Sequence, residues 1–149
     1  MMTFALSYAL FPSADRTIEE LDIREATFRY LFITNADWVK DDGTYCLGIG
    51  TRGREKNPDD AFMERFYGNK PAVRKASACN QSNLGVTDKT TGKHGVILRT
   101  EAIKWISEAD VEIDGGDFVA GNGGSGNTYY LRKIDGKWTV QRVVRHWIS

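Results

Sequence analysis

The C-terminal stretch GNTYYLRKIDGKWTVQRVVRHWIS, residues 126–149, decides the fold class that this sequence predicts. Two runs rich in aromatic and β-branched residues flank the dipeptide Asp135-Gly136. Asp-Gly between two such runs is typical of a two-residue hairpin turn, which also sets the register of the strands. The stretch therefore predicts a β-hairpin in which Tyr129 lies opposite Arg142.

This register sorts the side chains of the hairpin onto two faces, because successive residues of a strand point to opposite sides. The more apolar face is expected to look toward a helix, and it carries Tyr129, Leu131, Trp138, Val140, Arg142, Val144, His146 and Ile148. The opposite face carries Tyr130, Val143 and Trp147. A tyrosine, an arginine and a histidine are thus predicted to lie together on the inner face of the sheet.

Two more strand-like runs precede the hairpin, and short turns separate all four runs. Consecutive strands with short connections form antiparallel meanders, so residues 95–149 are predicted to form one. The Gly115-Gly116 pair indicates a bulge or a sharp bend of the sheet. The glycine-rich residues 121–126 match neither the dinucleotide-binding pattern nor the P-loop, and we interpret them as a flexible loop.

A long helix is predicted before the sheet, from Ser13 or Asp15 to about Ala36, because this segment contains neither Gly nor Pro. Thr17 and Glu20 have the spacing of a capping box. One broad arc of the helix is apolar, and it contains Ile18, Leu21, Ala26, Phe28, Phe32 and Ile33. Glu25 falls within this arc, so its carboxylate is expected to point toward the sheet.

The middle of the chain is predicted to contain a strand at residues 44–50, an exposed loop at 51–57, a short helix at 58–66 and a strand at 72–79. Residues 80–94 are rich in turn formers and are interpreted as a long loop. Residues 1–12 are interpreted as an arm or an edge strand. The prediction for residues 1–149 is a single α+β domain, with the N-terminal helix packed on a strongly bent, mainly antiparallel sheet of about five to six strands.

Length and charge limit the classes of function. The 149 residues suit one domain, and 20 Lys and Arg balance 20 Asp and Glu, so the formal net charge is zero. No basic run alternates with aromatic residues, and no apolar run reaches the roughly 18 residues of a membrane span. We therefore expect neither nucleic acid nor a membrane as a partner.

The two cysteines indicate the redox state of the compartment in which the protein folds. Cys46 and Cys79 lack CxxC spacing, so we expect free thiols in a reducing environment rather than a disulfide. The apolar run at residues 4–11 is short and has no basic residues before it, which disfavours a signal peptide. The sequence therefore predicts a cytoplasmic protein. With two His and no HExxH or Cys/His cluster, it predicts neither a metal site nor a cofactor.

The segments TYYLRKIDGKW and HWIS, residues 128–138 and 146–149, resemble the C-terminal part of a group of small uncharacterised bacterial proteins. A helix followed by a meander whose last hairpin carries DGKW also resembles the nuclear transport factor two-like fold, with a cystatin-like variant as the alternative. That resemblance implies a cone-shaped fold, a pocket between helix and curved sheet, and frequent homodimers through the outer face of the sheet. It implies no particular chemistry, because this fold serves many functions.

The residues and the resemblance together predict a small-molecule-binding domain with a pocket between the first helix and the C-terminal hairpin. Glu25, Tyr129, Arg142 and His146 are the predicted ligand-binding residues, with Arg142 holding a carboxylate or phosphate group of an organic ligand. A partly buried ion pair between Glu25 and Arg142 is the structural alternative for the same pattern.

Two other classes of function remain open at this point. One is a pocket enzyme of the isomerase or hydratase type, in which Glu25 or His146 acts as general base. The other is a protein-interaction or immunity-type protein that uses Tyr130, Val143 and Trp147 on the outer face of the sheet.

Overall fold

The computed structural model describes residues 14–121 and 123–149, and it confirms the predicted α+β architecture. Its elements are α1 (Ala14–Val39), β1 (Thr44–Ile49), α2 (Asp60–Glu64), β2 (Ala72–Lys75), a 3₁₀ turn (Ala76–Ala78), β3 (Cys79–Ser82), β4 (Gly85–Asp88), β5 (Gly95–Trp105), β6 (Asp110–Ala120), β7 (Gly123–Ile134) and β8 (Lys137–Ile148). The arm predicted at residues 1–12 lies outside the described residues.

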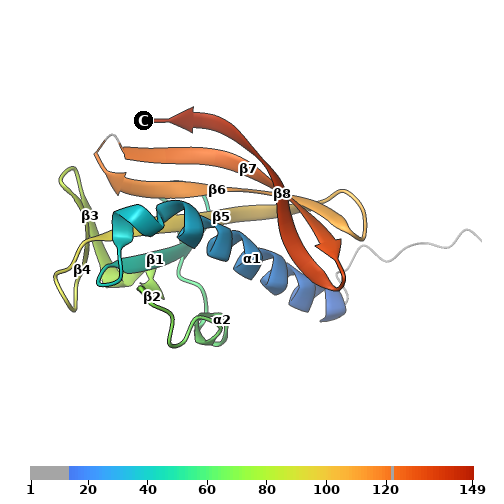
Figure 1. Cartoon of the computed structure of the whole chain (residues 1–149), viewed down its shortest axis with the longest axis horizontal. Coiled ribbons are helices and arrows are strands. Elements are labelled where there is room, and N and C mark those ends of the chain that lie inside the picture. The colour runs from blue at the N-terminus through green and yellow to red at the C-terminus, as the bar shows by residue number, and fades with distance from the viewer. Residues whose placement is uncertain (1–13, 122) are drawn as a thin grey trace, which may run out of the picture.

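A six-stranded sheet in the order β2-β1-β5-β6-β7-β8 carries the long helix α1 on one face (Figure 1). The strands β5 to β8 form the predicted antiparallel meander. β1 instead runs parallel to both of its neighbours, β2 and β5. It is buried along nearly its whole length, as is usual for a parallel strand in the interior of a sheet.

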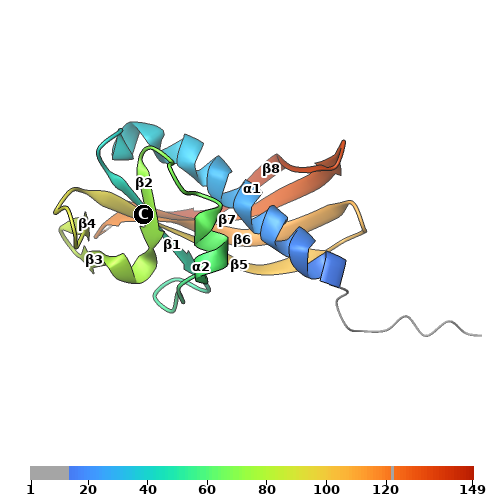
Figure 2. The same cartoon turned by 90° about the horizontal axis from the view of Figure 1, so that it is seen from below.

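α1 crosses the strands diagonally, and α2 lies beside it (Figure 2). The largest fully buried side chains of the helix are those of Ile23, Phe28, Leu31 and Val39. Two residues of the predicted apolar arc, Ile18 and Ile33, are instead 55% and 76% exposed. The arc was too broad, because the sheet and α2 together cover only part of the circumference of the helix. Phe62 of α2, for example, packs against Phe28, with ring centroids 6.1 Å apart.

The start of α1 agrees with the prediction, whereas its end does not. The helix begins at Ala14, between the two predicted start residues, so Thr17 lies inside its first turns rather than at its cap. It continues to Val39, three residues beyond Ala36, where Nε2 of His94 lies 2.8 Å from the Val39 carbonyl oxygen. The side chain of His94, which immediately precedes β5, thus contacts one of the terminal carbonyls that the helix leaves without an internal partner.

α2 is shorter than the helix predicted at residues 58–66. Asp59 is its N-cap, and the Asp59 carboxylate accepts a hydrogen bond from the Phe62 backbone nitrogen at 2.8 Å. Pro58 therefore precedes the cap instead of occupying the first helical position. The helix ends at Glu64, but Phe66 after it is still 3% exposed and belongs to the core around α1.

The turn of the C-terminal hairpin is as predicted. Asp135 and Gly136 have φ angles of 49° and 77°, as both central residues of a type I′ turn require. From this turn the strands pair regularly as far as Leu131 and Val140. Figure 1 shows the turn end of the β7–β8 hairpin curling toward the N-terminal half of α1.

β-Bulges in β8 overturn the predicted faces of the hairpin. Gln141 is an extra residue, so Arg142 pairs with Tyr130 instead of Tyr129. A shift of one residue moves the side chains that follow to the opposite face of the sheet, until the second bulge at His146 restores the predicted faces of Trp147 and Ile148. Val143 consequently lies opposite Tyr129 on the α1 side, where it packs against the core, and Arg142 faces away from α1.

Glycines in β6 and β7 let large side chains lie flat on the sheet. Most of the predicted glycine-rich loop is strand, since β7 begins at Gly123. A Cβ atom on Gly126 would overlap the Trp147 indole, and one on Gly116 would lie 2.9 Å from the Arg99 guanidinium. The irregularity predicted at Gly115-Gly116 is a register shift between β5 and β6 that begins beside this pair. These glycines are explained by close packing rather than by loop flexibility.

The segment predicted as a long loop at residues 80–94 contains a hairpin, and the cysteines do not stay free. β3 and β4 pair antiparallel, and Val86 of β4 packs with Ile97 and Phe118 against the sheet face opposite α1. In the same cluster, Cys46 of β1 forms a disulfide with Cys79 of β3, with Cα atoms 6.4 Å apart. The two residues are 33 positions apart in the chain, and the topology that brings β3 under β1 has no signature in their spacing.

Candidate functional site

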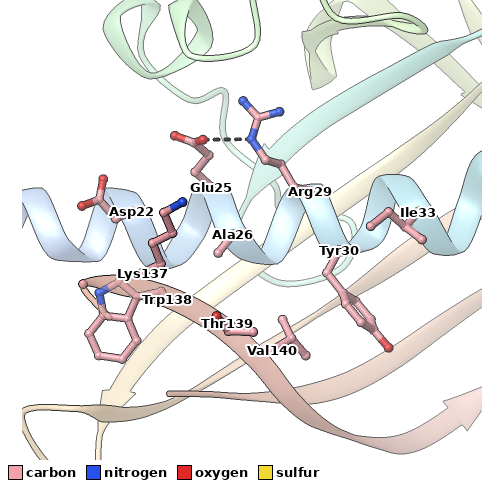
Figure 3. A pocket seen from close by; sticks show the side chains of 11 residues that line it. Asp22, Glu25, Ala26, Arg29, Tyr30, Ile33, Lys137, Trp138, Thr139 and Val140 are labelled. Carbon is pink, nitrogen blue, oxygen red and sulfur yellow. Dashed lines mark hydrogen bonds and ion pairs between the residues drawn. The ribbon is translucent and has the colours of Figure 1, made fainter. Parts of the chain in front are cut away.

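Within the described part of the chain, two hollows lie between α1 and the C-terminal strands. The groove, as we call the first, has a volume of about 650 Å³ and is lined by α1 residues between 22 and 33 and by residues 136–140 (Figure 3). The cavity, as we call the second, has a volume of about 500 Å³. It lies under the C-terminal half of α1 and is walled by β6, β7 and β8.

The charged side chains of the groove are already engaged in ion pairs. The Glu25 carboxylate lies 2.8 Å from Nε of Arg29 and 3.1 Å from a guanidinium nitrogen of Arg65, and Asp22 lies 2.7 Å from the same nitrogen. Figure 3 shows Glu25 and Arg29 leaving the helix on the side away from β8. The prediction that Glu25 points toward the sheet is therefore wrong, because the arginine after α2 draws its carboxylate to the rim.

The wall of the cavity carries a continuous network of hydrogen-bonded side chains. Asp117 accepts a hydrogen bond from the Ser125 hydroxyl at 3.0 Å and one from the Asn35 amide nitrogen at 3.3 Å. Asn127 donates to the Ser125 oxygen at 3.1 Å and to the Tyr129 oxygen at 3.0 Å. Since residues i, i+2 and i+4 of a strand share a face, β7 aligns three of these groups along the cavity.

This network leaves acceptor atoms without donors. Because Ser125 donates its hydroxyl proton to Asp117, it must accept from Asn127, which orients the amide group of Asn127. Oδ1 of Asn127 is then buried and has no hydrogen-bond partner among the described residues. The Asp117 carboxylate accepts two hydrogen bonds but has roughly four lone-pair sites. The polar part of the wall is therefore short of hydrogen-bond donors.

The remaining wall of the cavity is mostly apolar and aromatic. Its apolar and aromatic side chains are those of Tyr30, Leu31, Trp38, Val119, Val143 and Ile148, and the exposed Thr34, Arg145 and Ser149 add polar groups. The rings of Tyr30 and Tyr129 meet edge to face, with centroids 5.8 Å apart. Burial, aided by the negative charge of Asp117, raises the pKa of Tyr129 to about 12. Its hydroxyl is therefore protonated at neutral pH and is the one titratable donor among the three β7 side chains of this network.

The raised pKa of Tyr129 predicts a loss of stability at alkaline pH. The unperturbed pKa is 10.0 and the folded pKa is about 12, so the unfolded chain loses this proton first as the pH rises. The stability that results is fully present below pH 10.0 and is lost as the pH rises through about 12. We expect the unfolding free energy of the wild type to fall more steeply across this window than that of Tyr129→Phe, measured by urea denaturation. Parallel slopes for the two proteins would contradict the burial of this phenol.

Arg142 and His146 lie on the face of the sheet opposite α1, so neither reaches the cavity. The Arg142 guanidinium lies over the Tyr130 ring, 4.1 Å from its centroid. His146 is the extra residue of a second bulge, and its Nε2 lies 2.6 Å from Oγ1 of Thr128. Of the four predicted ligand-binding residues, only Tyr129 lines the cavity. The predicted convergence is wrong because the first bulge reverses the faces of β8.

The three residues predicted for an interaction surface are separated as well. Val143 lines the cavity on the α1 side. Tyr130 and Trp147 are on the opposite face, where the Trp147 ring lies within 4.7 Å of the Arg52 guanidinium carbon and 5.7 Å of that of Arg99. Arg99 is only 4% exposed, so this part of the outer face is covered by the protein's own side chains.

The sequence contained a partial signal for the site that was missed. Ser125, Asn127 and Tyr129 alternate along one strand face, but the glycines around Ser125 favoured a loop, so the predicted strand began too late. Asn35 and Asp117 had no such signal. These two residues are 82 positions apart in the chain, and they meet only because α1 lies across β6.

Comparison with known proteins adds no relative to this description. No protein-family model, curated protein or solved structure matches the chain. None of the helices in residues 14–121 and 123–149 is long and apolar enough to cross a membrane. Within the same ranges, no group of three or more His, Cys, Asp or Glu side chains could hold a metal ion. The fold and the site thus define an α+β protein with a partly polar cavity under its long helix.

Proposed function

We propose that this protein binds a small organic molecule in the cavity under the C-terminal half of α1. The observation that carries the proposal is the partly exposed carboxylate of Asp117 on the cavity wall, which accepts two hydrogen bonds and has roughly four lone-pair sites. A ligand in the cavity can donate hydrogen bonds to the sites that remain.

The size and lining of the cavity support the same function. Its volume of about 500 Å³ lies within the range of small-molecule sites, roughly 300–1,000 Å³. Such sites combine mostly apolar walls with a few fixed polar groups, and the network around Asp117 and Asn127 fits this description. Because each of these side chains is hydrogen-bonded to another, the wall is held in place before a ligand arrives.

Catalysis of the isomerase or hydratase type receives no support from the site. That alternative needed Arg142 and either Glu25 or His146 in the pocket, but Arg142 and His146 both lie on the face of the sheet opposite α1. Glu25 is paired with two arginines at the rim of the groove, which leaves it no free role as a base. We therefore propose binding rather than catalysis.

A bulky side chain at the cavity wall tests the proposal. Thr34 is an exposed residue of α1 that lines the cavity, so Thr34→Trp should obstruct it at little cost to the fold. A small-molecule library would be screened by ligand-observed NMR and by thermal shift. Ligands at about 100 times their Kd should stabilise the wild type by about 2.7 kcal/mol. Thr34→Trp should abolish this stabilisation.

Asp37→Trp is the matched control, because Asp37 is an exposed residue of the same helix that does not line the cavity. It should retain the ligands of the wild type. The proposal fails if no compound binds, or if the bound compounds perturb amide resonances away from Ser125, Asn127 and Tyr129.

We also propose kinship with the nuclear transport factor two-like fold. A helix that lies across a curled, mainly antiparallel sheet, with a cavity between them, supports this kinship.

The cytoplasmic location predicted from free thiols loses its main support with the Cys46–Cys79 disulfide. Disulfides persist in oxidising compartments, so we propose that the chain folds in one of these.

A further inference from the structure

On the basis of the proposed function, we infer that the ligand is an organic ammonium compound, which presents its protonated amine to Asp117 and its apolar body to the aromatic wall. This inference names the chemical class that the cavity selects. The groups on the polar wall determine this class of ligand, because they accept hydrogen bonds and one of them is negatively charged.

The carboxylate of Asp117 is the centre of the site. It is half-buried and already receives two neutral donors, Ser125 and Asn35, at 3.0 and 3.3 Å. Neither donor carries a charge, so the negative charge of the carboxylate is not neutralised by them. An ammonium group supplies the missing positive charge and up to three N–H donors for the remaining lone-pair sites of Asp117. Hydrogen bonds between charged groups are also stronger than neutral ones.

An anionic ligand would meet unfavourable charge at the same place. The negative charge of Asp117 contributes to the raised pKa of Tyr129, so it already disfavours a second negative charge on this strand face. Tyr129 would be the main donor available to an anion, and its oxygen already accepts a hydrogen bond from Asn127. A ligand with a carboxylate in this position would therefore bind poorly.

Two arginines near the cavity carry a positive charge, which would repel an ammonium group. Arg145 lines the cavity but is exposed, and charges in water are screened over roughly 8 Å at physiological ionic strength. Arg99 lies on the far side of the sheet, donates to the Ser125 carbonyl oxygen at 3.2 Å and lies 3.7 Å from the Glu101 carboxylate. Direct contact with Asp117 outweighs both, because the arginines act through solvent or through the sheet.

Three probes with the same apolar body test the inference: phenethylamine, 2-phenylethanol and 3-phenylpropanoate. They differ only in carrying a positive, a neutral or a negative polar end at neutral pH. Their Kd values would be measured on the wild-type protein by NMR titration of the amide resonances of Ser125, Asn127 and Tyr129. We expect phenethylamine to bind at least about tenfold more tightly than 3-phenylpropanoate, with the alcohol between them.

Variants separate the charge of Asp117 from the shape of the cavity. Asp117→Asn should remove the preference for the amine, whereas Arg145→Gln should keep or increase it. The ranking of probes on the wild type tests the inference even if Asp117→Asn does not fold. An equal or reversed ranking would overturn the ammonium class while leaving a binding cavity in place. Failure of all three probes to shift these resonances would overturn the proposed function as well.

Discussion

Reduction of the Cys46–Cys79 disulfide is expected to lower the free energy of unfolding by about 3.5 kcal/mol. The bond closes a loop between residues 33 positions apart. Loop-closure entropy gives roughly 3 kcal/mol for a 15-residue loop and roughly 4.7 kcal/mol for a 100-residue loop, and this one lies between them. Guanidinium denaturation with and without dithiothreitol measures the difference.

The double variant Cys46→Ala/Cys79→Ala is the control for this experiment. It should be about as unstable as the reduced wild type, and dithiothreitol should leave its denaturation curve unchanged. Thiol titration of the unfolded, non-reduced wild type should find no free thiol. Two free thiols in that titration would refute the disulfide and with it the proposal of an oxidising compartment.

Val143→Asp is expected to destabilise the protein by about 2–3 kcal/mol, whereas Arg142→Asp should cost less than about 1 kcal/mol. Val143 faces α1 and packs against the core, so a carboxylate there loses hydration without gaining a partner. Arg142 is exposed on the other face, and its replacement removes only the contact with the Tyr130 ring. Urea denaturation of both variants measures the two costs.

The comparison places the same new residue at adjacent positions of one strand. The larger change in net charge falls on Arg142→Asp, the variant expected to be the more stable, so charge alone cannot produce the expected order. It tests the bulge at Gln141 directly. In a hairpin without the bulge, Arg142 would face α1 and Val143 would face outward, and the order of the two costs would be reversed. That reversed order would also remove Val143 from the wall of the cavity.

The separation of the predicted site residues follows from the same bulge. Counting from the Asp135-Gly136 turn correctly predicted the pairs up to Leu131 and Val140. Beyond that point one unpaired residue was enough to exchange Arg142 for Val143 on the inner face. Nothing in the residues around Gln141 indicates a bulge, because no residue there has a positive φ angle and so no glycine is needed to mark the place.

The cavity illustrates a second limit of prediction from the sequence. Tyr129 was predicted on the inner face because it lies close to the turn, on the strand without the extra residue. Asp117 and Asn35 were not predicted, since each is an ordinary polar residue within its own element. Their significance arises from a contact between residues 82 positions apart in the chain, and no local sequence pattern predicts such a contact.

By itself, the sequence determined the long N-terminal helix, the four strands of the C-terminal meander and the type I′ turn of the last hairpin. These features depend on propensity, on apolar periodicity and on turn residues, all of which act over a few neighbouring positions. Only the tertiary structure decided the parallel pairing of β1, the disulfide, the faces of β8 and the polar wall of the cavity. Each of these depends on how distant elements lie across one another, and a single bulge or crossing angle changes the outcome without changing any local preference.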